Sequence, residues 1–364
     1  MAPLRIGLVG GTPGRGWAGR AHVPAYRALP DVELVALCTA HPDTAVAAAK
    51  EHGVTEYYDN YQDLVRSPNV DVISVVTKVL AHHEIAQAAL EAGKHVYSEW
   101  PLDVSESRAV ELAALAKSKG LRHAVGLQAR FCPPLLHMKS LIESGYIGQV
   151  MTFNLSMFGA GAFGPRTSAQ LYQARKESGA GTLTVSMGHS IDGLRWLLGD
   201  IQDVSGLVEA KVNQWTLTDT KETVDVTTPD NIAVIARLQS GATGTVHSSN
   251  TAPEGSGFRL EVYGTEGKLT ARSTGLIELS KITLTGAKTG EAEHEMAEPK
   301  ELTWVPVQDQ GESAFNIAQL FSRFAQSIRE GKDFSPGFVE AARLHHLLET
   351  IDQSSQAGRR LPLE

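Results

Sequence analysis

The stretch from Leu4 to His22, LRIGLVGGTPGRGWAGRAH, constrains the fold of this chain more than any other. Leu4, Ile6, Leu8 and Val9 form a short apolar run, which is typical of a strand buried on both faces of a parallel sheet. Glycines follow at positions 10, 11, 14, 16 and 19. Because glycine has no Cβ, the backbone can turn sharply and bring its N–H groups close to a pyrophosphate at a helix N-terminus. The stretch therefore predicts a strand, a phosphate-binding loop and a helix.

The frame of this loop differs from the usual one. The pattern G-x-G-x-x-G falls on Gly14, Gly16 and Gly19, four residues after Gly10, where the strand is expected to end. We expect a lengthened loop in which Gly10 makes the tight turn, Gly16 opens the helix, and Thr12 and Arg15 add a hydroxyl and a cation towards the phosphates. An ordinary glycine-rich strand–helix turn is the alternative.

Composition limits the function classes. The chain has 364 residues, enough for two domains, and a formal charge of −8, which argues against broad binding to nucleic acid or to anionic membranes. The two cysteines, Cys38 and Cys132, cannot build a disulfide framework or a zinc site. Since no signal peptide precedes the first strand and no apolar run reaches spanning length, the sequence predicts a soluble, cytoplasmic protein.

Apolar strands and amphipathic helices alternate regularly over residues 1–128. This alternation predicts a doubly wound parallel sheet, a Rossmann domain, with ligands at the carboxyl edges of the strands. The expected strands after the first are 32–37, 54–58, 70–77, 95–98 and 121–127.

The pattern changes over residues 129–364, where alternating strands predict an α+β domain with a large open, mainly antiparallel sheet. The overall fold class is therefore α/β. The polar stretch 159–181 is too long for an idle connection and is expected to cover a site. The two closing helices, 312–330 and 338–356, can pack back on the first domain. The expected strands are 148–158, 204–215, 231–239, 242–250, 258–263, 268–271 and 276–284.

The end of the second strand bears on the cofactor. An acidic residue there holds the ribose 2′-OH of NAD, and its absence accompanies a 2′-phosphate. Here Thr39 and His41 precede the first carboxylate, Asp43. Both can donate to a phosphate, so the sequence slightly favours NADP over NAD as the NAD(P) cofactor. The alternative is that Asp43 only caps the following helix.

An ordered series of longer segments resembles the Gfo/Idh/MocA family of NAD(P)-dependent sugar and cyclitol oxidoreductases over essentially the whole chain. The resemblance implies a Rossmann domain and an α/β domain whose open sheet carries the substrate site on one side and often the subunit interface on the other. It also implies a homodimer or homotetramer. The segments are HHEIAQAALEAGKHVYSEWP, VGLQARFCPPL, LIESGYIGQV, SGAGTLTVSMGHSIDGLRWLLGD and YGTEGKL.

Two residues that the family uses for catalysis are replaced. The resemblance implies a Glu-Lys-Pro turn and an Asp four residues before a His, which together handle the substrate proton. Here the turn reads Glu99-Trp100-Pro101, and Val185 stands four residues before His189. An indole cannot shuttle a proton at neutral pH.

These replacements resemble a branch of the family that includes the fungal galactose regulator of the Gal80 type. That regulator binds a dinucleotide as a sensor and is not known for turnover, so binding and chemistry are separate questions. Besides Glu-Trp-Pro, the shared features are Gly16-Trp17-Ala18, Lys78-Val79 and Gly188-His189.

Lys78 and His189 are the catalytic candidates. Lys78 follows a buried strand at the edge where the nicotinamide is expected, and partial burial there would lower its pKa. The alternative is a solvated lysine paired with Glu99 or Glu84. His189 is a candidate acid/base, oriented by Asp192 one helical turn on, or else a hydrogen-bonded core histidine.

The remaining candidates follow from the loop, the strand ends and the resemblance. No metal site is expected, because His82 and His83 are adjacent on a helix and point about 100° apart. Gln128 and Arg130 either bind ligand or tie the domains together. The cofactor-binding candidates are Gly10, Thr12, Arg15, Gly16, Trp17, Ala18, Thr39, His41, Thr77, Lys78, His82, Glu99, Trp100, Pro101 and Gln128, and the substrate-binding candidates are Arg130, Tyr172, Arg175, Lys176 and Asp192.

The sequence thus predicts an NAD(P)-dependent oxidoreductase that acts on a sugar, cyclitol or related polyol by hydride transfer. In one variant the dinucleotide stays bound and is used transiently, so that elimination or bond cleavage occurs next to a carbonyl. The alternative is a non-catalytic, Gal80-like regulator or partner protein.

Overall fold

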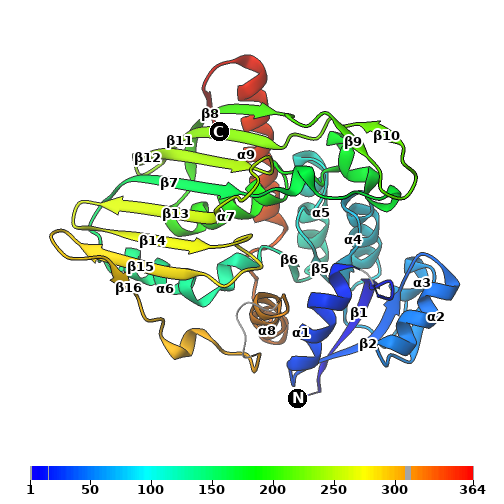
Figure 1. Cartoon of the computed structure of the whole chain (residues 1–364). Helices are drawn as coiled ribbons and strands as arrows, with labels where there is room; N and C mark the ends of the chain where they lie inside the picture. The colour runs from blue at the N-terminus through cyan, green and yellow to red at the C-terminus, as the bar shows by residue number, and fades with distance from the viewer. Residues whose placement is uncertain (1, 15, 308–312, 364) are drawn as a thin grey trace. The chain divides into compact units, whose positions relative to one another are not determined.

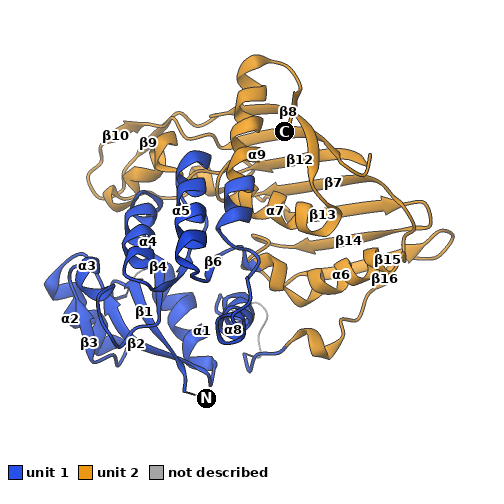
Figure 2. Cartoon of the chain, turned by 180° about the vertical axis from the view of Figure 1, so that it is seen from behind, with its two compact units in different colours: residues 1–128, 304–343 blue, residues 129–303, 344–364 orange. Residues whose placement is uncertain are grey.

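The computed structural model describes residues 2–14, 16–307 and 313–363 of the chain (Figure 1). The chain divides into two compact units (Figure 2): unit 1 comprises residues 1–128 and 304–343, and unit 2 comprises residues 129–303 and 344–364. The segment 304–343, which we assigned by sequence to the second domain, therefore groups with the first. The last helix belongs partly to each unit.

Unit 1 is built on a six-stranded, fully parallel sheet in the order β3-β2-β1-β4-β5-β6. This order is that of doubly wound dinucleotide-binding folds, so the predicted parallel sheet is confirmed. Ligands of such sheets bind where the strand order reverses, which here is the carboxyl edge of β1 and β4. The strands are β1 (Leu4–Gly10), β2 (Val32–Cys38), β3 (Glu56–Tyr58), β4 (Val72–Val76), β5 (His95–Ser98) and β6 (His123–Val125).

Helices connect these strands, and α8 from the C-terminal part of the chain packs against α1 within unit 1. The helix α5 ends at Gly120, whose φ of 63° provides the left-handed residue that terminates a helix. The helices are α1 (Val23–Ala28), α2 (Pro42–Glu51), α3 (Tyr61–Leu64), α4 (His82–Glu91), α5 (Glu106–Lys119), α8 (Phe315–Glu330) and the start of α9 (Phe338–Ala357).

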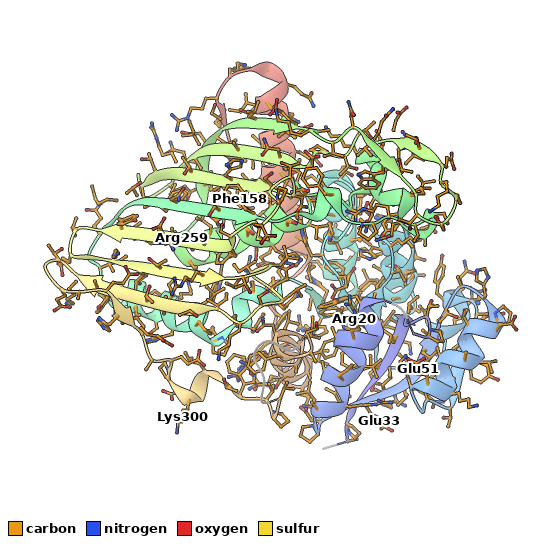
Figure 3. All side chains as sticks on the ribbon, viewed as in Figure 1. Arg20, Glu33, Glu51, Phe158, Arg259 and Lys300 are labelled. Atoms are coloured by element: carbon orange, nitrogen blue, oxygen red, sulfur yellow. The ribbon has the colours of Figure 1, made fainter. Side chains whose placement is uncertain are left out.

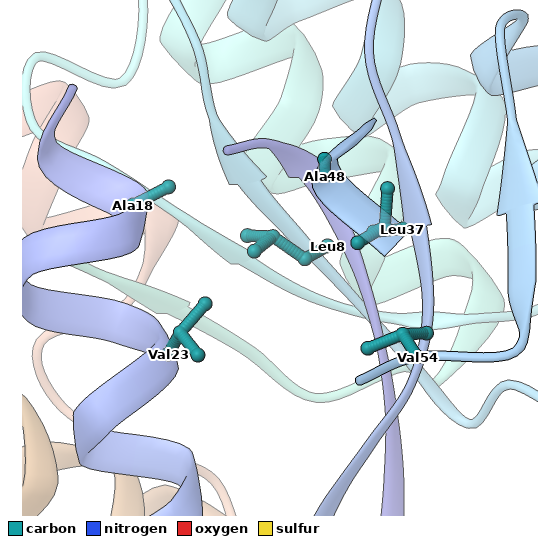
Figure 4. Packing of buried hydrophobic residues seen from close by; sticks show 6 residues of the cluster. All are labelled: Leu8, Ala18, Val23, Leu37, Ala48 and Val54. Atoms are coloured by element: carbon teal, nitrogen blue, oxygen red, sulfur yellow. The ribbon is translucent and has the colours of Figure 1, made fainter. Parts of the chain in front are cut away.

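A small apolar cluster fixes the first helix and α2 against the sheet (Figure 4). Leu8 on β1 and Leu37 on β2 are fully buried at its centre. Ala18 and Ala48 face them from the helices, and Val23 and Val54 complete the cluster. Truncating Leu8 to alanine would cost about 2–5 kcal/mol, and the same cluster holds the helix that follows the glycine loop in place.

Unit 2 contains a nine-stranded sheet in the order β16-β15-β14-β13-β7-β12-β11-β8-β17. The pair β7–β12 is parallel and the other pairs are antiparallel, which confirms the large, mainly antiparallel sheet. The strands are β7 (Val150–Phe158), β8 (Ile201–Glu209), β11 (Asn231–Leu238), β12 (Thr243–Ser249), β13 (Gly257–Gly264), β14 (Gly267–Ser273), β15 (Thr283–Lys288), β16 (His294–Glu295) and β17 (Leu361–Pro362).

Two of the expected strands are wrong. The expected strand 204–215 is divided into β8 and a separate β9 (Gln214–Thr216), which pairs with β10 (Thr223–Asp225). The expected strand 276–284 is a turn instead, in which the N–H groups of Leu279 and Ser280 donate to the carbonyl of Leu276. The strand begins later, as β15.

The large sheet has one apolar and one polar face. On β13, Phe258, Leu260 and Val262 are buried, whereas Arg259 and Glu261 point to the other side. Figure 3 labels Arg259 on β13. The helices α6 (Pro133–Glu143) and α7 (Ser186–Leu198) pack on strands of this sheet.

The polar stretch 159–181 forms three short 3₁₀ helices, Gly161–Phe163, Ser168–Ala174 and Lys176–Ser178. Among the described residues, no helix combines the length and the apolar character that crossing a membrane requires.

Candidate functional site

The glycine loop leaves β1 through a backbone conformation that requires glycine. Gly10 has a φ of +128°, and a Cβ at this position would lie 2.2 Å from the carbonyl oxygen of Val76 on β4. Gly16 has a φ of +93°, and a Cβ on it would meet nothing within 4 Å. Helical structure begins at Ala18, as a π-helical turn that continues into α1. The loop thus fits a ligand approached closely by backbone, while Arg15 lies outside the described residues.

Trp17 supplies an unusual donor in this loop. Its indole Nε1 is buried and has no hydrogen-bond partner within the described part of the chain. A buried N–H without an acceptor costs about 1–3 kcal/mol. An oxygen of a bound dinucleotide would satisfy it, so the loop fits the cofactor that the fold implies. Thr12, nearby in the loop, is exposed.

A network of buried polar side chains contacts Glu99, in the turn that follows β5. The Nε2 of His22 is 2.9 Å from Oε1 of Glu99, and Tyr97 donates to the same oxygen at 2.6 Å. His22 Nδ1 also lies 2.9 Å from the hydroxyl of Tyr26, which in turn is 2.7 Å from Ser74 Oγ. Burial and the Glu99 carboxylate raise the pKa of Tyr97, so its hydroxyl stays protonated as a donor. The network holds the Glu99 carboxylate inward.

His82 links the ends of β4 and β5. Its Nδ1 lies 2.8 Å from the carbonyl oxygen of Pro101, and its Nε2 lies 3.1 Å from that of Thr77. Burial lowers the pKa of His82, whereas two carbonyl neighbours favour a proton on each nitrogen. His82 as a whole is 1% exposed, so it supports two predicted cofactor-binding turns and does not present its nitrogens outward. Trp100, beside Pro101, is also buried, at 4% exposure.

The other predicted cofactor residues of unit 1 differ in exposure. Lys78 is exposed, so the partial burial expected for it is wrong. Thr39 is buried, and its hydroxyl lies 2.6 Å from that of Thr44. His41 is exposed at the N-cap of α2. Gln128 is 1% exposed, and its Oε1 has no hydrogen-bond partner among the described residues.

In unit 2, α7 carries His189, which is 5% exposed. Its Nδ1 is buried and has no hydrogen-bond partner in the described ranges, and its Nε2 lies 3.8 Å from Oε1 of Glu278. Glu278 is itself 4% exposed. Two buried, ionisable side chains are therefore neighbours at the position where the resemblance implies an acid/base group.

Asp192 has a partner other than His189. The guanidinium of Arg130 donates to both carboxylate oxygens of Asp192, from Nε at 2.8 Å and from Nη2 at 2.5 Å. The Asp192 side chain is 1% exposed and that of Arg130 is 12% exposed. Two residues that we predicted as substrate contacts are thus bound to each other.

The polar stretch presents its candidate residues in different ways. Lys176 forms an ion pair with Asp352 at 2.8 Å. Arg175 is exposed, and Tyr172 accepts a hydrogen bond from Gln173 at 3.3 Å. Within the described residues, no group of three His, Cys, Asp or Glu side chains is arranged to hold a metal ion.

Sequence reasoning missed His22 and Glu278. His22 ends the first helical turn after the glycine loop, and nothing in its local pattern distinguishes it from a core residue. Glu278 lies within the apolar run 276–284, for which the sequence predicts a strand and no functional residue.

Two family models match the chain. The model described as "Oxidoreductase family, NAD-binding Rossmann fold" covers residues 4–127, and the model "GFO/IDH/MocA C-terminal domain" covers residues 135–270. Together they span more than half of the chain.

Proteins similar to the chain include an enzyme and a regulator. Levoglucosan dehydrogenase from Pseudarthrobacter phenanthrenivorans is 28% identical over 74% of this chain and 73% of its own length. The galactose/lactose metabolism regulatory protein GAL80 from Saccharomyces cerevisiae is 24% identical over 99% of this chain and 94% of its own. The crystal structure of an oxidoreductase domain protein from Kribbella flavida has a TM-score of 0.89, with 25% identity and full coverage of both chains.

Proposed function

This chain belongs to the Gfo/Idh/MocA family of NAD-binding oxidoreductases, and from that premise we propose that it is an NAD(P)-dependent enzyme that oxidises or reduces a sugar, cyclitol or related polyol. The observation that carries the proposal is the state of His189. His189 is buried, and its Nδ1 has no hydrogen-bond partner among the described residues. The carboxylate of Glu278 lies near its other ring nitrogen, Nε2. Such a group can exchange a proton with a substrate hydroxyl.

The proposed cofactor site is built from the carboxyl edge of the unit 1 sheet. The backbone of the glycine loop and the indole N–H of Trp17 would face the pyrophosphate, and Thr39 and His41 would lie near the adenosine ribose. Because the Thr39 hydroxyl already has Thr44 as a neighbour, it gives NADP no additional support over NAD. The residues proposed to hold the dinucleotide are Gly10, Thr12, Arg15, Gly16, Trp17, Ala18, Thr39, His41, Thr77, Lys78, Glu99, Trp100, Pro101 and Gln128.

When bound, the nicotinamide supplies the acceptor or donor of the hydride. His189 takes the proton from the substrate hydroxyl as hydride leaves the same carbon, and returns it in the reverse direction. Lys78, exposed at the end of β4, is the second candidate for this proton. The proposed substrate contacts are Tyr172 and Arg175. Any further contact from Arg130, Lys176 or Asp192 would have to be made while that residue stays in its ion pair.

A non-catalytic regulator is the second candidate function. Trp100 and Val185 replace the lysine and the aspartate that the family's dehydrogenases use, and the similarity to GAL80 runs over nearly the whole chain. A tightly retained dinucleotide would fit either this function or transient redox chemistry.

We also propose that the protein is cytoplasmic and forms a homo-oligomer through the polar face of the large sheet. Ile235 on β11 and Leu207 on β8 are 60% and 50% exposed there, which is high for large apolar side chains. Sedimentation of wild-type protein and of Ile235→Lys tests this interface.

The proposed function is tested first by identifying the cofactor. Freshly purified protein is denatured, any released dinucleotide is identified by absorbance and mass, and NAD(H) and NADP(H) are titrated into the emptied protein. Exchangeable binding of one cofactor supports an ordinary dehydrogenase, and retention without exchange supports transient redox chemistry or sensing. Binding of neither cofactor would contradict the proposal.

A further inference from the structure

Glu278 lies in the turn 276–280, which contacts α7. The turn follows β14 and is closed by backbone hydrogen bonds to the carbonyl of Leu276. Ile277 is fully buried, and its Cδ1 would lie 2.9 Å from a Cβ on Gly193 of α7. Gly193 therefore leaves the space in which Ile277 sits. His189 lies one helical turn before Gly193, so this contact brings the next residue, Glu278, to the histidine.

We propose that Glu278 is the carboxylate that positions His189 and stabilises its protonated form, in place of the acid that is missing at Val185. Val185 is the N-cap of α7, one turn before His189, and the N–H of His189 donates to its carbonyl. A carboxylate at that position would act from the start of α7. In this chain the carboxylate comes from a different element, 3.8 Å from His189 Nε2. The role in turnover rests on the proposed function, whereas the pairing itself does not.

The physical reason is the low polarity around the pair. The side chains of His189 and Glu278 are 6% and 4% exposed. An imidazolium is unfavourable in such surroundings unless an anion lies within about 4–6 Å. At the observed separation the carboxylate favours the charged ring by electrostatic attraction, without a direct hydrogen bond. His189 Nδ1 is left to exchange a proton with substrate, because no described residue binds it.

Other charged groups near α7 do not provide this effect. The elements that pack on α7 include α6, β7 and β12, and β7 carries no charged side chain. Among the described residues, Glu278 is the carboxylate within 4.0 Å of the His189 ring. On α7, Asp192 is paired with Arg130, and Arg195 is paired with Asp200. On α6, Lys139 and Glu143 are paired with each other, and His137 is the remaining titratable residue. On β12, His247 lies near Asn231.

The test compares His189 titration in three proteins by NMR of histidine ring resonances. The His189 signal is identified among 13 histidines as the one missing in His189→Gln. Glu278→Gln keeps the shape of the side chain and removes its charge. The control is Glu261→Gln, which removes a carboxylate paired with Arg259 elsewhere in unit 2.

Because Glu278→Gln removes the charge that faces the ring, we expect it to move the measured His189 titration to lower pH, and Glu261→Gln to leave that titration unchanged. An unchanged His189 pKa in Glu278→Gln would overturn the proposal. If Glu278→Gln does not fold, Glu278→Leu decides in the same way, since it also removes the charge and keeps a side chain of similar size.

Turnover provides a separate readout. Once a substrate is found, the pH at which kcat reaches half its maximum should fall in Glu278→Gln together with the pKa of His189, and an unchanged kcat profile would contradict the role in proton transfer. If the protein has no turnover, the proposed function fails, but the NMR titration still establishes or refutes the pairing.

Discussion

Arg130 and Asp192 form a two-point ion pair between the start of the second unit and the middle of α7, with N···O distances of 2.8 and 2.5 Å. The sequence predicts a substrate contact for each partner, whereas the structure binds them to each other. The carboxylate is 1% exposed, so its negative charge depends on the guanidinium for compensation. The pair therefore fixes the helix that carries His189.

Removing this carboxylate should destabilise the protein strongly. We expect Asp192→Asn to lower the free energy of unfolding by about 3–5 kcal/mol, because it breaks a buried, two-point ion pair. The control is Asp200→Asn, which breaks the pair with Arg195 at the end of the same helix but changes a side chain that is 51% exposed. That variant should lose about 1 kcal/mol or less. Equal urea-unfolding midpoints for the two variants would show that the Arg130 pair has no special structural role.

The indole N–H of Trp17 should contribute to dinucleotide binding. Trp17→Phe keeps an aromatic ring in the loop and removes the donor, so we expect the Kd for the preferred dinucleotide to rise about tenfold. Trp215→Phe is the matched control, since the Nε1 of Trp215 is also buried without a partner in the described structure but lies on β9. Calorimetric titration measures both. If Trp17→Phe binds as tightly as wild type, the donor faces no cofactor oxygen.

Acid should destabilise the protein through His123. Burial lowers the pKa of His123 to about 4, and its Nδ1 accepts the N–H of Phe338 at 3.0 Å. His123 therefore takes up a proton near pH 6.5 in the unfolded chain, but only near pH 4 in the folded chain. Stability present at pH 7 is lost as the pH falls through this window, by about 3 kcal/mol for this residue.

The measurement is urea unfolding of wild type and of His123→Gln at several pH values between 7 and 4. The variant should be less stable at pH 7, because it lacks the ring that stacks on Phe338 at a centroid distance of 4.5 Å. Its stability should nevertheless fall less steeply with acid. Carboxylates add to the acid loss in both proteins, so the difference between the two slopes isolates His123. Parallel slopes would contradict the assignment.

The fold of the Rossmann domain was predictable because it is encoded in patterns of residues that are close together in the sequence. Leu8 lies in a continuous apolar run because its strand is buried on both faces, and Gly10 is needed where β1 touches Val76. The alternation of such runs with helices leaves few possible topologies. The same reasoning located the glycine loop and the turn at Glu99.

The second half was less predictable, because its important contacts join distant residues. The apolar residues Leu276, Ile277 and Leu279 resemble a strand, but they form a turn whose Ile277 packs against α7. The pairing of Arg130 with Asp192 spans 62 residues. Local patterns do not encode such pairings, and for this reason the sequence alone did not indicate Glu278 as the neighbour of His189.

Hydride transfer is the central claim, and its most direct test is reduction of a bound dinucleotide. The protein is loaded with NAD⁺ or NADP⁺, mixed with a panel of sugars, cyclitols and other polyols, and followed by nicotinamide absorbance. We predict reduction with at least one polyol by wild-type protein, and loss of that reduction in His189→Gln with dinucleotide binding retained. Tight binding with no reduction by any polyol, and no effect of His189→Gln, would contradict the account and favour the regulator.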